Sequence, residues 1–162
     1  MIVRVAPDVP NTLIEVRLHD APVAFGPIDP YPVEAGGECV FLGRTRRETH
    51  PDHGALVRLS YHAYESMARR TLVELAETTA RRFRCHVVRI HHALGEVPPG
   101  GASVMIQVAC AHRAEAFDAC RSIIDQLKRT APIWKQERWA DGTTWSEGVP
   151  AGPPADEGAM ST

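Results

Sequence analysis

The order in which strand-like and helix-like hydrophobic patterns alternate between residues 55 and 139 constrains the fold most. Segments 56–64, 86–94, 102–110 and 133–139 read as strands. Apolar residues at a spacing of three to four predict helices over 65–84 and 112–130, and Pro132 ends the second helix because proline disfavours helix at the residue before it. The order β-α-β-β-α-β is that of ferredoxin-like folds. We therefore predict an α+β protein with a ferredoxin-like core.

Further elements flank this core. Residues 12–19 alternate in polarity and residues 38–45 are rich in apolar side chains, so both are predicted as additional N-terminal strands. Asp141-Gly142 is a strong turn signal that leads to Trp145 and predicts a C-terminal hairpin. We expect an N-terminal extension over 1–11, where prolines interrupt any regular element, one domain over 12–148, and a disordered tail over 149–162.

Composition excludes several classes of protein. A net charge of −2 provides no basic field for nucleic acid. No apolar run approaches the roughly 20 residues that cross a bilayer, and the N-terminus lacks the apolar core of a signal peptide. The four cysteines form no C-x-x-C pair, and no histidines stand at metal-ligand spacing. We expect a cytoplasmic protein with no metal site and no cofactor.

The scarcity of lysine marks the candidate site. Of 18 basic residues only Lys128 and Lys135 are lysines, and the other 16 are arginines. Arginine keeps its proton in proteins, whereas a lysine amine can lose it when desolvated or placed near another cation. Lys128 lies at the edge of the apolar stripe of its helix, so we expect it to be partly desolvated. On the extended segment after Pro132, Lys135 and Glu137 share one face, which is equally consistent with a plain surface ion pair.

Two further positions suit an anion. His112 and Arg113 open the second helix, where free backbone N–H groups and the helix dipole favour a phosphate. The alternative is that His112 only caps the helix and Arg113 is solvated. Arg44 and Arg46, two residues apart at the end of a strand, would share a face and form a second anion clamp.

Five motifs resemble the large, catalytic subunit of molybdopterin synthase, over about residues 12–148. They are Phe41-Leu-Gly-Arg-Thr-Arg46, Leu59-Ser-Tyr-His-Ala-Tyr-Glu-Ser-Met-Ala68, Ala111-His-Arg-Ala-Glu-Ala-Phe117, Leu127-Lys-Arg-Thr-Ala-Pro-Ile-Trp-Lys-Gln-Glu137, and Asp141-Gly142 with Trp145. The resemblance implies a homodimer that holds two copies of a small ubiquitin-like sulfur-carrier subunit in a heterotetramer. The carrier's C-terminal Gly-Gly thiocarboxylate would enter a pocket and supply sulfur to cyclic pyranopterin monophosphate, which gives the dithiolene of molybdopterin.

The resemblance also implies roles for individual residues. Lys128 matches the family's essential pocket lysine, and Lys135 its second lysine. Substrate-binding roles are implied for Arg44, Arg46, His112, Arg113 and Glu137, with His112 and Arg113 reaching the pocket across the dimer interface. The chain departs from the family pattern at Ala93, where an arginine is usual, and at His62, where glutamate is common.

Two other functions remain open at this point. A dimeric ferredoxin-like domain could be a non-catalytic module that senses a small anion, and replacing Lys128 by alanine would separate it from an enzyme. An RNA-binding domain would need exposed aromatics on its sheet and a basic surface, which the net charge argues against.

Overall fold

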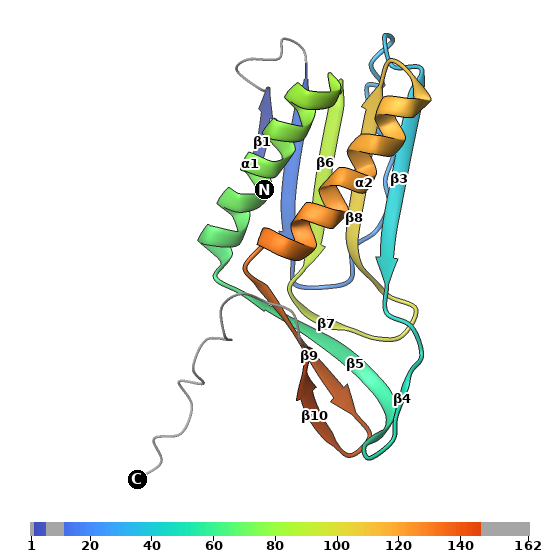
Figure 1. Cartoon of the computed structure of the whole chain (residues 1–162), viewed down its shortest axis with the longest axis vertical. Coiled ribbons are helices and arrows are strands. Elements are labelled where there is room, and N and C mark those ends of the chain that lie inside the picture. Colours follow the sequence, from blue (N-terminus) through green and yellow to red (C-terminus); the bar gives the residue numbers. More distant parts are fainter. Residues whose placement is uncertain (1, 6–11, 147–162) are drawn as a thin grey trace.

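The computed structural model describes residues 2–5 and 12–146, which form two sheets and two helices (Figure 1). The sheet that packs against both helices, here called the main sheet, has five strands in the order β1 (Ile2–Val5), β2 (Leu13–His19), β6 (Val87–Ala93), β8 (Ala102–Cys110) and β3 (Gly37–Arg44). The second, here called the small sheet, has the order β10 (Gly142–Trp145), β9 (Ile133–Trp139), β5 (Gly54–Ala63) and β4 (Thr49–His50), with β7 (Gly95–Val97) also paired to β5.

Helices α1 (Glu65–Phe83) and α2 (Arg113–Thr130) pack side by side on one face of the main sheet (Figure 1). Their apolar stripes, which include Leu72 and Ile123, meet strand residues such as Ile90 and Ile106 in the largest core cluster. Every residue of β8 is buried because the helices cover one of its faces and the segment 20–36 covers the other. No helix in the described part of the chain is long and apolar enough to cross a membrane.

The α+β class, the two helices and the C-terminal hairpin are confirmed. The pairing differs from the ferredoxin-like expectation, because β5 and β9 pair with each other in the small sheet and β2 and β3 take their places beside β6 and β8. Polar residues alternate with apolar ones along β5, and β9 carries four polar residues in succession, Lys135 to Arg138. Both patterns suit a partly solvated sheet rather than the doubly covered main sheet. The predicted extension also contributes β1, which pairs with β2, whereas the predicted tail over 149–162 lies outside the described residues.

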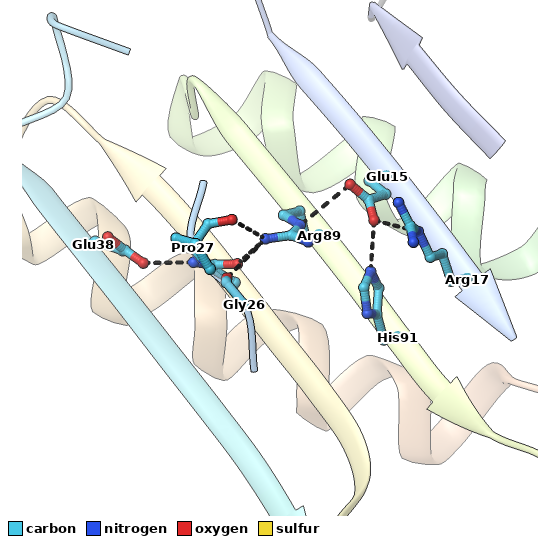
Figure 2. Close-up of polar contacts among 8 residues, drawn as sticks. Glu15, Arg17, Gly26, Pro27, Glu38, Arg89 and His91 are labelled. Atoms are coloured by element: carbon cyan, nitrogen blue, oxygen red, sulfur yellow. Dashed lines mark hydrogen bonds and ion pairs between the residues drawn. The ribbon is translucent and has the colours of Figure 1, made fainter. Parts of the chain in front are cut away.

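A chain of polar contacts crosses the face of the main sheet opposite the helices (Figure 2). Its members are Glu38, Gln107, Arg89, Glu15, Arg17 and His91. Arg89 also donates to the carbonyls of Gly26 and Pro27, at 3.0 and 3.1 Å, and so holds the segment 20–36 against the sheet. Burial raises the pKa of Glu15, but the hydrogen bond from His91 and the charges of the two arginines outweigh it, so this pKa lies below its usual value.

Candidate active site

A cavity of about 540 Å³ lies where the ends of β3 and α2 meet the small sheet. Five of the seven site residues predicted from the sequence line it: Arg44, Arg46, Lys128, Lys135 and Glu137. Apolar side chains of the small sheet and α2 form part of its wall, among them Leu56, Leu59 and Leu127. The cavity therefore combines four cationic side chains with an apolar surface.

Helix α2 leads directly into β9 (Figure 1), and the lysines of these two elements line the same cavity. The helix ends at Thr130, Pro132 follows, and β9 then runs back along β5 with Lys135 opposite Tyr61. Lys128 is exposed, so the predicted partial desolvation is wrong. Phe117 and Ile124, its neighbours on that edge of the helix, are themselves exposed and half-buried, so this edge of the apolar stripe is not covered within the chain. Lys135 is half-buried.

Lys135 and Glu137 share a face of β9, as predicted, and form an ion pair with 3.2 Å between Nζ and Oε1. Burial raises the pKa of Glu137. Hydrogen bonds from Ser146, Thr144 and Lys135 and the charge of Lys135 lower this pKa by more than burial raises it, so the pKa lies below its usual value. The carboxylate is therefore held in its ionised form.

Arg44 and Arg46 both line the cavity from the end of β3 and the residues that follow it. Arg44 Nη1 donates to the carbonyl of Gly100 at 2.8 Å, which fixes its guanidinium against the loop before β8. Arg46 Nη2 lies 2.8 Å from Oε1 of Glu48, an exposed ion pair that also borders the cavity. Such a pair is worth little in water, so a bound anion could replace Glu48 as the partner of Arg46.

His112 and Arg113 do not line this cavity. They lie at the opposite end of α2 from Lys128, about 22 Å away for fifteen residues of helix. Both side chains are exposed, and His112 occupies the N-cap position without a capping hydrogen bond from its side chain. One chain alone therefore does not unite all seven predicted residues.

Tyr61 and His92 line the cavity but were not predicted as site residues. Their rings contact edge to face with centroids 5.2 Å apart. Burial lowers the pKa of His92 to about 4, against a hydrogen bond that Nδ1 donates to the carbonyl of Ala93 at 2.7 Å, so its imidazole is neutral. Burial also raises the pKa of Tyr61. The alternation of strand 56–64 places Tyr61 beside Leu59, but only the pairing of β5 with β9 shows that this face borders a cavity.

The described residues contain no cluster of three or more His, Cys, Asp or Glu side chains that could hold a metal ion. The side chains that line the cavity supply cations, carboxylates, a phenol and a neutral imidazole. These groups can bind an anion and can give or take protons.

A family model described as MoaE protein matches residues 20–130. The chain belongs to the MoaE family. This MoaE-family chain is 36% identical over 151 residues to a molybdopterin synthase catalytic subunit of Nostoc sp., which covers 87% of the chain and 90% of that relative. It is 38% identical over 114 residues to a catalytic subunit of the same name from Caulobacter vibrioides, over 70% of the chain and 73% of the relative.

Solved structures agree with this family. The X-ray structure of molybdopterin synthase from Staphylococcus aureus superposes with a TM-score of 0.67 and 26% identity, over 79% of this chain and 96% of that chain. A complex of subunits 1 and 2 of molybdopterin-converting factor from Helicobacter pylori has a TM-score of 0.64 over 82% of this chain and 90% of that chain, and at 20% identity it shows the fold alone. The family and the assignment as an enzyme of molybdenum cofactor biosynthesis, both predicted from the sequence, are confirmed.

Proposed function

We propose that this MoaE-family enzyme transfers sulfur from the thiocarboxylated C-terminus of a small ubiquitin-like carrier to cyclic pyranopterin monophosphate, which yields the dithiolene of molybdopterin. The observation that carries the proposal is the convergence of Arg44, Arg46, Lys128 and Lys135 on one cavity. A phosphate ester needs fixed cations, and the formation of C–S bonds needs proton donors and acceptors beside the reacting carbons. Lys128 and Lys135 are the proposed catalytic residues.

Within this cavity the two arginines supply the anion clamp at the β3 end. Glu137 lies on the β9 side and pairs with Lys135. Tyr61 and His92 add neutral polar groups to the lining, which suit the uncharged ring system of a pterin better than its phosphate. A lining that holds both cations and neutral polar groups supports a ligand with a charged and an uncharged part.

We further propose that a second copy of the chain completes the site with its own His112 and Arg113. The face formed by α2 and β3 supports this, because β3 is the last strand of the main sheet and Phe117 and Val40 are 63% and 39% exposed beside it. A groove of about 480 Å³ between β3 and α2 runs from Cys39 to Lys128 along the same face. A two-fold axis across the middle of α2 would bring the partner's helix N-terminus next to this chain's Lys128.

The carrier subunit is proposed from the sequence resemblance, and the two-subunit name of the Helicobacter pylori complex is consistent with it. A flexible Gly-Gly terminus is thin enough to enter a cavity of this size beside the bound substrate. The cytoplasmic location stays an expectation from the sequence.

Reconstitution tests the function directly. Purified protein with a thiocarboxylated carrier and cyclic pyranopterin monophosphate should yield molybdopterin, and unmodified carrier should yield none. Lys128→Ala should abolish turnover while the circular dichroism spectrum and melting temperature stay those of the parent. A Lys128→Ala variant that keeps full turnover would contradict the catalytic role of Lys128. A parent protein that binds the substrate but yields no molybdopterin would favour a binding module.

A further inference from the structure

The C-terminal hairpin of β9 and β10 carries a directed chain of hydrogen bonds toward the cavity. Gly142 makes the turn with φ of 117°, and Thr144 then lies directly opposite Glu137 in the register of the hairpin. The indole Nε1–H of Trp139 donates to Thr144 Oγ1 at 2.8 Å, and this hydroxyl donates to Glu137 Oε2 at 3.0 Å. Trp139 is buried against Leu56 and Leu59, so the chain starts in the core of the small sheet.

The second carboxylate oxygen is held from the same hairpin. Ser146 Oγ donates to Glu137 Oε1 at 2.5 Å, and the backbone N–H of Ser146 donates to the carbonyl of Lys135 at 3.0 Å. Oε1 also faces the Lys135 ammonium at 3.2 Å. Both oxygens of this carboxylate are therefore occupied by donors from β10 and the residue after it, and the ammonium is its remaining partner.

The direction of this chain is set by the chemistry of its members. An indole N–H can only donate, so the Thr144 oxygen must accept from Trp139 and is left to donate its own hydrogen to Glu137. A carboxylate that accepts two hydroxyl hydrogens keeps its charge and its orientation. The orientation of Glu137 in turn determines where the Lys135 ammonium lies at the cavity wall.

We propose that Thr144 and Ser146 are positioning residues for Lys135, acting through the Glu137 carboxylate. The inference rests on the proposed function in one respect, the catalytic role of Lys135. It accounts for the hairpin motif Asp141-Gly142 with Trp145, because the turn sets the register that brings both hydroxyls to Glu137. Loss of the hydroxyls frees the carboxylate to rotate and to take up a proton at a higher pH.

The test compares a double variant, Thr144→Val with Ser146→Ala, with the matched control Thr143→Val on the exposed side of the same strand. The double variant should lower kcat about tenfold at neutral pH, with a smaller change in KM, and should move the acid limb of the kcat profile to higher pH. Thr144→Ser alone, which keeps a hydroxyl at this position, should keep most of the activity of the parent. The control should match the parent, and all variants are checked by their melting temperatures.

A second readout is independent of turnover, because the chain has only two lysines. The ζ-ammonium NMR resonances are assigned with Lys128→Arg and Lys135→Arg, and the pH titration of the Lys135 signal then reports the ionisation of Glu137. In the double variant its midpoint should rise, whereas Thr143→Val should leave it in place. An unmoved midpoint, or unchanged kcat and pH profile, would overturn the proposal. A shifted midpoint in a protein without sulfur transfer would support the positioning network and refute the proposed reaction instead.

Discussion

The proposed sharing of the site between two chains predicts complementation between two inactive variants. In one chain, Arg113 and Lys128 lie about 22 Å apart along α2. A sphere with the volume of the cavity is only about 10 Å across, so Arg113 cannot serve the cavity of its own chain. If Arg113 serves the partner's cavity, Lys128→Ala and Arg113→Ala homodimers are both inactive, but a mixed dimer contains one site with Lys128 and Arg113 intact.

The expected magnitude follows from counting sites. A mixed dimer isolated with two different affinity tags should have about half the turnover of the wild-type dimer, measured as molybdopterin formed with excess thiocarboxylated carrier. Random association of equal amounts of the two variant chains should give about one quarter of the wild-type turnover, because half of the dimers are mixed and each mixed dimer has one intact site. A mixed dimer of Lys128→Ala with Lys135→Ala is the control: both residues belong to the same chain's cavity, so neither site is intact. Activity no higher than that of the separate homodimers would refute the sharing of Arg113.

Three predictions concern stability. Burial holds the pKa of His92 at about 4, below its ordinary 6.5. The free energy of unfolding should therefore be highest above pH 6.5 and should fall by about 3 kcal/mol as the pH drops to 4, because the unfolded chain takes up the proton first. Denaturant unfolding checks this, and the loss should vanish in His92→Phe. Gly37→Ala should lower the free energy of unfolding by about 1–3 kcal/mol, because the new Cβ would lie 2.9 Å from the backbone nitrogen of Arg113. A new Cβ at Gly26 would meet nothing within 4 Å, so Gly26→Ala should leave the stability unchanged when both variants are compared by thermal melting. Glu15→Gln should destabilise the fold by about 3 kcal/mol at pH 7, because it leaves the largely buried Arg89, together with Arg17, without a carboxylate partner. The difference in unfolding free energy from the parent should shrink as the pH falls from 4.5 through the lowered pKa of Glu15, and an equal difference at all pH values would contradict this.

Local patterns of apolar residues in the sequence predicted most of the helices and strands. Apolar spacing predicted both helices and strands β2, β3, β5, β6, β8 and β9 within a residue or two, because each element buries one stripe or face against the core. The short strands β4 and β7 were not predicted. The assignment of strands to sheets was less accessible, since β5 and β9 could pair with β6 and β8 or with each other, and only tertiary packing decides between these partners. The strand β1 was missed because prolines follow it closely in the sequence.

The candidate site was predictable where its residues are neighbours in the sequence. Lys128 and Lys135 flank one short connection, so any fold that reverses the chain there brings them together. Tyr61 and His92 come from strands far away in the sequence, and no local signal links them to the lysines. The exposure of Lys128 depends on which neighbouring elements cover that side of α2. A helical wheel gives only the angular position of a residue and says nothing about its neighbours in the fold.

The pairing of β5 with β9 has a consequence for how the protein is made. β5 leaves the ribosome before either helix, yet β9, the strand with which it makes its longest pairing, is translated only after both. Closing so long a loop delays this contact relative to the packing of helices on strands that are already synthesised. We expect nascent chains to assemble the helix-covered layer first, so a product truncated before residue 133 would keep much of its hydrophobic core and lack the cavity altogether.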